Sequence, residues 1–177
     1  DRRQRQMCIR DRLRAEPCFL HALFISDKLT QLKERFMYGL KTESSFDAAH
    51  FLTDYHGKCE NLHGHRWRVV AYLAQEKLWN EGTHKDMVID FGEFKHVLRE
   101  LTEELDHSFI VEEGSLMPET LACLEKEGFA LSMMPFRTTA ENLARYFYDR
   151  MADSGLSISQ VEVYETPNNC AIYYGEN

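Results

Sequence analysis

Two histidines and a cysteine fall close together in residues 59–65, which read CENLHGH. His63 and His65 alternate along a segment that fits a strand, so their side chains point to one face. Gly64 between them carries no side chain and lets another backbone approach the opposite face. His50 ends a second alternating segment, on the face expected to be buried. If the two segments pair, three imidazoles meet at one end of a sheet.

Three histidines without an obvious fourth protein ligand are typical of an open, catalytic zinc site, where the free position polarises a substrate oxygen or activates water. The alternative is that they are ordinary histidines of a sheet. Cys59 leaves a second choice open. It could be a fourth ligand that makes the zinc structural, a base or nucleophile beside the metal, or a small buried apolar residue.

Three further residues have types that could serve catalysis. Asp106 and His107 adjoin at the end of a helical segment, where a carboxylate can orient an imidazole for acid–base work. Alternatively, His107 complements a helix dipole. Glu165 shares a strand face with Val161 and Val163, so its carboxylate needs a partner. Paired N–H groups on the edge of a pterin or purine would suit it, and a strand-end salt bridge is the alternative.

The periodicity around these residues predicts an α+β fold, with an antiparallel sheet and helices packed on one face. Apolar residues at helical spacing predict helices over 91–105 and 118–127, and a third whose capping box has Thr138 as the cap and Glu141 three residues later. Alternation and strand-forming residues predict strands over 38–50, 62–74, 157–165 and 170–174.

The bulk composition suits one enzyme-sized domain. The chain has 177 residues, a net charge of -8 and 44% hydrophobic residues. The acidic balance argues against nucleic-acid binding, and the apolar runs are too short to span a membrane. Five cysteines at irregular spacing favour a reduced, cytoplasmic setting.

Residues 1–36 differ in character, because DRRQRQMCIRDR is strongly basic while the remainder is acidic. This stretch resembles translated sequencing-adaptor read-through, and the regular pattern begins after Met37. We expect 1–36 to be a non-native or disordered extension without a functional role, and 37–177 to be the domain. The alternative is a genuine N-terminal helix that packs on a partner.

Six segments, in this order and spacing, resemble the pterin synthase family that includes 6-pyruvoyltetrahydropterin synthase and 6-carboxytetrahydropterin synthase. They are FDAAHFL, CENLHGH, MVIDFGEFK, LDHSFI, PFRTTAENLA and VYETPNNCAIY. The resemblance implies the tunnelling fold, with a four-stranded antiparallel sheet and helices between the strand pairs. It also implies edge-to-edge assembly into a hexamer of two trimers, with active sites at subunit interfaces.

The resemblance also implies roles for individual residues. By this resemblance, the zinc ligands are His50, His63 and His65, and the catalytic base is Cys59. Asp106 and His107 are its proton-relay partners. Glu165 anchors the pterin ring, and Thr139 and Glu141 lie near the substrate.

Three residues separate Cys59 from His63, a spacing similar to the QueD-like, 6-carboxy-forming branch. This implies a carbon–carbon lyase that converts 7,8-dihydroneopterin triphosphate to 6-carboxy-5,6,7,8-tetrahydropterin, losing acetaldehyde and triphosphate, in queuosine (deazapurine) synthesis. The alternatives are the pyruvoyl-forming synthase, and a zinc- and pterin-binding module without catalysis. Residues 111–134 are a longer insertion than in compact members.

Overall fold

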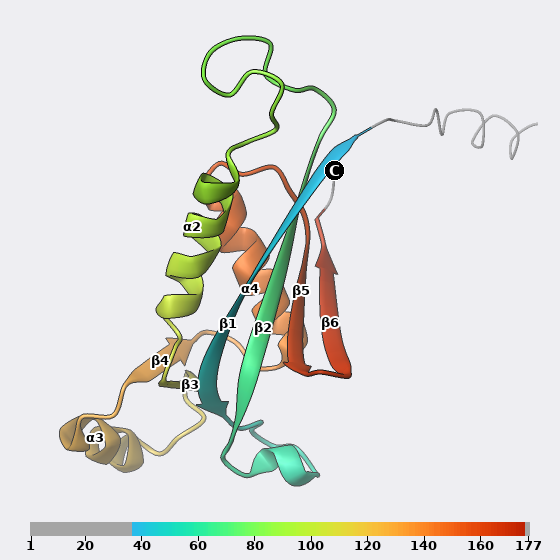
Figure 1. The fold of residues 1–177 in the computed structure, drawn as a ribbon. Helices are drawn as coiled ribbons and strands as arrows, with labels where there is room; N and C mark the ends of the chain where they lie inside the picture. Colours follow the sequence, from blue (N-terminus) through green and yellow to red (C-terminus); the bar gives the residue numbers. More distant parts are fainter. Residues whose placement is uncertain (1–36, 176–177) are drawn as a thin grey trace, which may run out of the picture. The chain divides into compact units, whose positions relative to one another are not determined.

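A computed structural model describes residues 37–175 of the chain, so the expectation for 1–36 lies outside the described residues. Two long strands, β1 (Tyr38–His50) and β2 (His63–Gln75), form an antiparallel pair at the centre of the sheet (Figure 1). Their register runs from Tyr38 opposite Gln75 to His50 opposite His63. The alternation in the sequence therefore predicted both the strands and their pairing.

The sheet in residues 37–175 has six strands in the order β4-β3-β1-β2-β5-β6. β5 (Ile158–Thr166) and β6 (Asn169–Tyr174) continue it antiparallel, so four of the strands match the expected sheet. β3 (Ser108–Glu112) and β4 (Leu131–Met134) correct the expected count. They pair parallel to β1 and to each other. With five and four residues, they are too short to show a period.

Two helices, α2 (Phe91–Glu103) and α4 (Ala140–Asp153), pack against one face of the sheet (Figure 1). Their apolar stripes meet the inward side chains of the strands in one core, whose largest fully buried members include Phe46, Trp67, Phe94, Leu98, Leu143 and Phe147. The α+β class with helices on one face is confirmed. A third helix, α3 (Pro118–Glu127), connects β3 to β4 and buries none of its residues.

The start of α4 differs from the expected capping box. Thr139, not Thr138, is the N-cap, and its hydroxyl accepts a hydrogen bond from the backbone N–H of Asn142. Thr138 is fully buried, and its hydroxyl donates to the carbonyl oxygen of Phe51. Two adjacent threonines offered the same cap, and Thr138 is engaged instead with the end of β1.

The opposite face of the sheet carries charged pairs. Arg66 lies 3.2 Å from Asp47, and Arg68 lies 3.3 Å from Glu43. β1 meets β3 only near its end, through Ala48 and Ala49. Within residues 37–175, most of this edge of β1 therefore has no neighbouring strand.

Candidate metal centre and adjoining site

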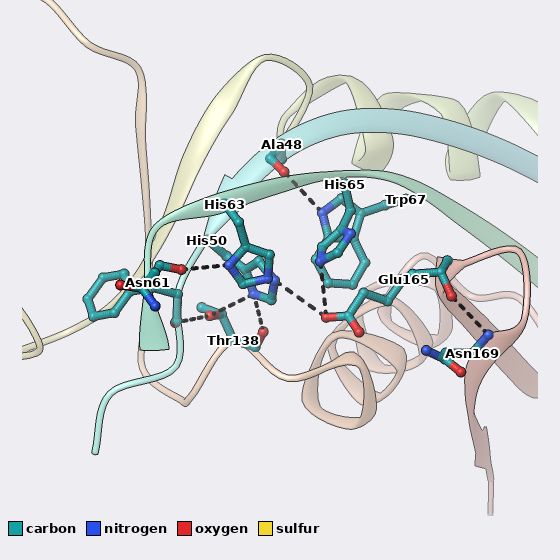
Figure 2. A network of polar contacts seen from close by, with 11 residues as sticks. Ala48, His50, Asn61, His63, His65, Trp67, Thr138, Glu165 and Asn169 are labelled. Atoms are coloured by element: carbon teal, nitrogen blue, oxygen red, sulfur yellow. Dashed lines mark hydrogen bonds and ion pairs between the residues drawn. The ribbon is translucent and has the colours of Figure 1, made fainter. Parts of the chain in front are cut away.

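Three histidine rings gather where β1 ends and β2 begins (Figure 2). The ring centroids of His50 and His63 are 4.5 Å apart, those of His63 and His65 4.8 Å, and those of His50 and His65 5.3 Å. Cross-strand pairing brings His50 beside His63, and strand alternation places His65 on the same face. The structure brings together the three residues that the sequence singled out as ligands.

Backbone carbonyls orient two of these rings. His50 Nδ1 lies 2.9 Å from the carbonyl oxygen of Thr138, and His63 Nδ1 lies 2.7 Å from that of Asn61. A carbonyl oxygen can only accept, so each Nδ1 carries the hydrogen and each Nε2 keeps its lone pair. This is the contact that fixes the tautomer and orientation of a metal-binding histidine.

The Nε2 atoms of His50, His63 and His65 are buried, and within residues 37–175 none has a hydrogen-bond partner. Glu165 faces them, with Oε1 3.4 Å from His50 Nε2 and 3.5 Å from His65 Nε2 (Figure 2). The four ligand atoms lie within 4.8 Å of one another. Three imidazole nitrogens suit a zinc ion, so the histidines fit the metal that the sequence predicted, and Glu165 lies beside them.

The electrostatics of the cluster favour the charge states in which these side chains bind a metal. The pKa of Glu165 is held below its ordinary value, mainly because the His50 imidazole faces its carboxylate, with a smaller contribution from His65. Burial lowers the pKa of His65, while Glu165 acts against that shift. An ionised carboxylate and a neutral imidazole are the forms that bind a metal cation.

The sequence did not predict that Glu165 would lie against the histidines. It placed Glu165 correctly on the face of Val161 and Val163, because strand residues two apart share a face. The pairing of β5 with β6 shifts between Tyr164 and Thr166. Irregularities of this kind re-aim a side chain beside a site.

A hollow of about 380 Å³ adjoins the cluster and contains Cys59, Thr139, Glu141 and Glu165 in its lining. Cys59 is held there by its loop, because its carbonyl oxygen accepts a hydrogen bond of 2.8 Å from the N–H of Leu52. The side chain of Cys59 is partly buried and its thiol is free. Four of the residues assigned to substrate chemistry are thus gathered beside the candidate metal centre.

Asp106 and His107 form the predicted pair, with Asp106 Oδ2 2.8 Å from His107 Nδ1. Asp106 Oδ1 accepts a 2.8 Å hydrogen bond from the N–H of Asp47. This bond, and next the one from His107, hold the pKa of Asp106 below its ordinary value. His107 lines a different hollow, of about 490 Å³, with Asp47, Gly64 and Arg66. The structure does not bring His107 into the hollow of Cys59.

Sequence reasoning missed the residues that support the ligands. Thr138 and Asn61 act through backbone carbonyls, which no residue type reveals. Trp67 is fully buried, lies edge-on to His50 and His65, and donates its indole N–H to the carbonyl oxygen of Ala48. Trp67 follows His65 by two positions along β2, and this alternation could have predicted that the two side chains share a face.

The sequence pattern of the family described as 6-pyruvoyl tetrahydropterin synthase matches residues 39–176. The chain belongs to this family. The 6-carboxy-5,6,7,8-tetrahydropterin synthase of Haemophilus influenzae is 36% identical over 140 residues, covering 77% of this chain and 99% of that protein. The enzyme of the same name from Aquifex aeolicus is 38% identical over 130 residues, covering 67% of this chain and 77% of that protein.

Solved structures share the fold. An uncharacterized protein from Wolinella succinogenes superposes with a TM-score of 0.65 at 22% identity, covering 80% of this chain and 99% of that one. The 6-pyruvoyl tetrahydropterin synthase of Plasmodium vivax gives a TM-score of 0.59 at 22% identity, with the same coverage. The tunnelling fold is therefore confirmed, and the family's enzymes support a lyase-type pterin synthase.

No helix within residues 37–175 combines the length and apolarity needed to cross a membrane.

Proposed function

We propose that the protein is a zinc-dependent 6-carboxy-5,6,7,8-tetrahydropterin synthase, acting in the cytoplasm in queuosine synthesis. It would convert 7,8-dihydroneopterin triphosphate, with loss of acetaldehyde and triphosphate. The observation that carries the proposal is the set of three buried Nε2 atoms, which lack a hydrogen-bond partner within residues 37–175, beside a hollow that contains Cys59 and Glu165. Relatives named for this reaction, and the three-residue spacing after Cys59, support the carboxy-forming branch.

His50, His63 and His65 would hold the zinc. When bound, the ion would supply a Lewis acid that polarises substrate oxygen atoms and stabilises developing negative charge. The carbonyls of Thr138 and Asn61 keep two of the rings turned toward the ion.

The remaining residues would divide recognition and proton transfer between them. Glu165, which is ionised at neutral pH as carboxylates ordinarily are, accepts N–H groups from the edge of the pterin ring. Thr139 and Glu141 line the same hollow and contact the substrate there. Cys59 removes a proton from the substrate side chain, and His107, oriented by Asp106, moves protons between side chain and ring.

We further propose that the working site is shared between subunits of a hexamer built from two trimers. Cys59 and His107 lie in separate hollows of one chain, so a neighbouring chain would supply the Asp106–His107 pair. The open edge of β1 and the outer strand β6 offer backbone groups for joining sheets edge to edge.

Mass spectrometry of the product from zinc-loaded protein and 7,8-dihydroneopterin triphosphate tests the reaction. A 6-carboxy product with acetaldehyde supports the proposal. A 6-pyruvoyl product moves the chain to the other branch of the family. Bound zinc and an intact oligomer without turnover would instead favour the non-catalytic binding module.

Mixing two inactive variants tests the shared site. Cys59→Ala and His107→Ala chains are unfolded together and reassembled. If the two residues come from different subunits, some sites regain both wild-type groups and activity returns. A mixture as inactive as its parents would place both residues in one chain. Sedimentation of the wild type measures the oligomer.

A further inference from the structure

Buried polar atoms without partners occur at a second place in the structure. Among residues 37–175, six buried side-chain atoms lack a hydrogen-bond partner, and three of them are the histidine Nε2 atoms. The other three are Thr53 Oγ1, Ser115 Oγ and Arg137 Nε. All three residues line one hollow of about 250 Å³. Because such atoms are costly to bury unsatisfied, three of them among the residues that line one hollow point to a place where a ligand binds.

Arg137 supplies the positive charge of this hollow. Its guanidinium donates to the carbonyl oxygen of Thr53 and lies 5.9 Å from the centre of the Tyr55 ring. It forms no ion pair with any residue in 37–175, whereas Arg66 and Arg68 each face a carboxylate. Its charge is therefore left for an anion.

The three partnerless groups can all donate a hydrogen bond: one guanidinium N–H and two hydroxyls. Donors from three residues that line one hollow suit the oxygen atoms of a phosphate group, which arginine binds with charge-assisted hydrogen bonds. A neutral ligand would leave the guanidinium without an anion at ion-pair distance among residues 37–175. The donor set thus favours a phosphate.

Three carboxylates, Asp54, Glu112 and Glu113, line the same hollow. They would repel a bare phosphate. They are suitable partners for a magnesium ion and its waters, and magnesium is bound in proteins by one or two carboxylates together with substrate phosphates. The three carboxylates do not form a metal site by themselves. Among the described residues, the ligand atoms that lie close enough together to hold a metal are those of the histidine cluster with Glu165. A polyphosphate with its magnesium satisfies both sets of groups.

The hollow lies close to the candidate metal centre. Thr53 follows His50 by three residues, a separation that an extended chain spans in about 10 Å. Arg137 directly precedes Thr138, whose carbonyl oxygen binds His50. Tyr55, beside the guanidinium, lines the hollow of Cys59. A ligand can therefore reach from one hollow toward the other.

We propose that Arg137, Thr53 and Ser115 bind the magnesium-complexed phosphate tail of the substrate. This inference rests on the proposed function for the identity of the ligand, and the phosphate site itself is tested independently. Arg137 is then a substrate-binding residue that distinguishes a phosphorylated pterin from the free pterin.

Binding of inorganic triphosphate to zinc-loaded protein, measured by calorimetry with magnesium, tests the site directly. We expect Arg137→Gln to weaken binding by about 10- to 100-fold, the loss of a charge-assisted hydrogen bond, and Arg137→Lys to weaken it less. Arg145→Gln is the matched control, because Arg145 pairs with Asp149 on the exposed side of α4. It should bind as the wild type does. Weaker binding without magnesium is expected from the carboxylates.

Wild type that binds no triphosphate, or Arg137→Gln that binds it equally well, would overturn the site. Equal affinity for triphosphate with and without magnesium would show that the three carboxylates play no part in the phosphate site. If Arg137→Gln does not fold, Ser115→Ala replaces it, with an expected loss of about 3- to 10-fold from one neutral hydrogen bond.

Kinetics with 7,8-dihydroneopterin triphosphate separate this inference from the proposed function. Arg137→Gln should raise KM by about tenfold or more and change kcat little, because the tail is bound similarly throughout the reaction. Inorganic triphosphate should compete with the substrate. Turnover by the wild type with an unchanged KM in Arg137→Gln would reject the phosphate site alone. Triphosphate binding that depends on Arg137, in a protein without turnover, would reject the proposed function alone.

Discussion

The carbonyl oxygen of Thr138 lies 2.9 Å from Nδ1 of His50, although 88 positions separate the two residues in the sequence. The contact joins the segment before α4 to the end of β1. It turns the Nε2 of His50 toward His63, His65 and Glu165. The orientation of one candidate ligand therefore depends on the correct docking of a distant helix.

Thr138→Val tests this dependence. The hydroxyl bond to Phe51 is lost, so we expect the free energy of unfolding to fall by about 1–2 kcal/mol. The backbone carbonyl loses its anchor, so zinc affinity should fall about tenfold. Urea unfolding and a zinc-competition titration measure the two effects. Ser159→Ala removes a comparable bond, to the carbonyl oxygen of Tyr72, and should leave zinc affinity intact. Equal zinc affinity in Thr138→Val would show that its side chain does not hold the carbonyl in place.

The roles of His63 and Cys59 are separable by metal analysis. We expect His63→Ala to lose both zinc and turnover, because it removes one of three nitrogen ligands. Cys59→Ala should keep its zinc, while kcat falls by about 10²- to 10⁴-fold through loss of a general base. Elemental analysis after dialysis gives the zinc content. Zinc released from Cys59→Ala would favour a structural, four-ligand site and contradict these roles.

Trp67→Phe tests how far the core supports the histidines. The change opens space under His50 and His65 and removes the bond to Ala48, so stability should fall by about 1–3 kcal/mol. Trp79→Phe is a matched control, because the indole of Trp79 also donates to a carbonyl oxygen, that of Val88, but its side chain is half exposed. We expect weaker zinc binding in Trp67→Phe alone. Similar losses in both variants would mean that Trp67 contributes no specific support.

The lowered pKa of Asp106 predicts a pH-dependent contribution to stability. The native state binds this proton less readily than the unfolded chain, so the contribution is full above the ordinary value of 3.8. It is lost as the pH falls through the lower native pKa. Asp106→Asn should therefore be less stable than wild type at neutral pH, and the difference should shrink below about pH 4. Urea unfolding across pH measures it, with exposed Asp153→Asn as the control. A difference that stays constant with pH would assign the effect to shape rather than charge.

The sequence predicted the cluster of three histidines because the necessary information is local. His63 and His65 share a face by alternation, and the strand pair carries His50 to them. It predicted neither β3 nor β4, because parallel pairing of short strands depends on distant partners. It chose Thr138 as the helix cap because local capping rules do not register a buried contact with His50. The separation of Cys59 from His107 depends on the packing of the whole domain, which the spacing of residues in the sequence does not reveal.

The positions of the three histidines and Glu165 in the sequence set the order in which the ribosome adds them to the chain. All three histidines lie within residues 50–65, on one hairpin of β1 and β2, whereas Glu165 comes 100 residues after His65. At about 5–20 residues per second, a ribosome needs about 5–20 s to cover that distance. The hairpin therefore leaves the ribosome with its imidazoles complete, before Thr138 can orient His50 and before Glu165 can face the cluster. A growing chain carries the three candidate nitrogen ligands well before it carries the groups that fix their geometry.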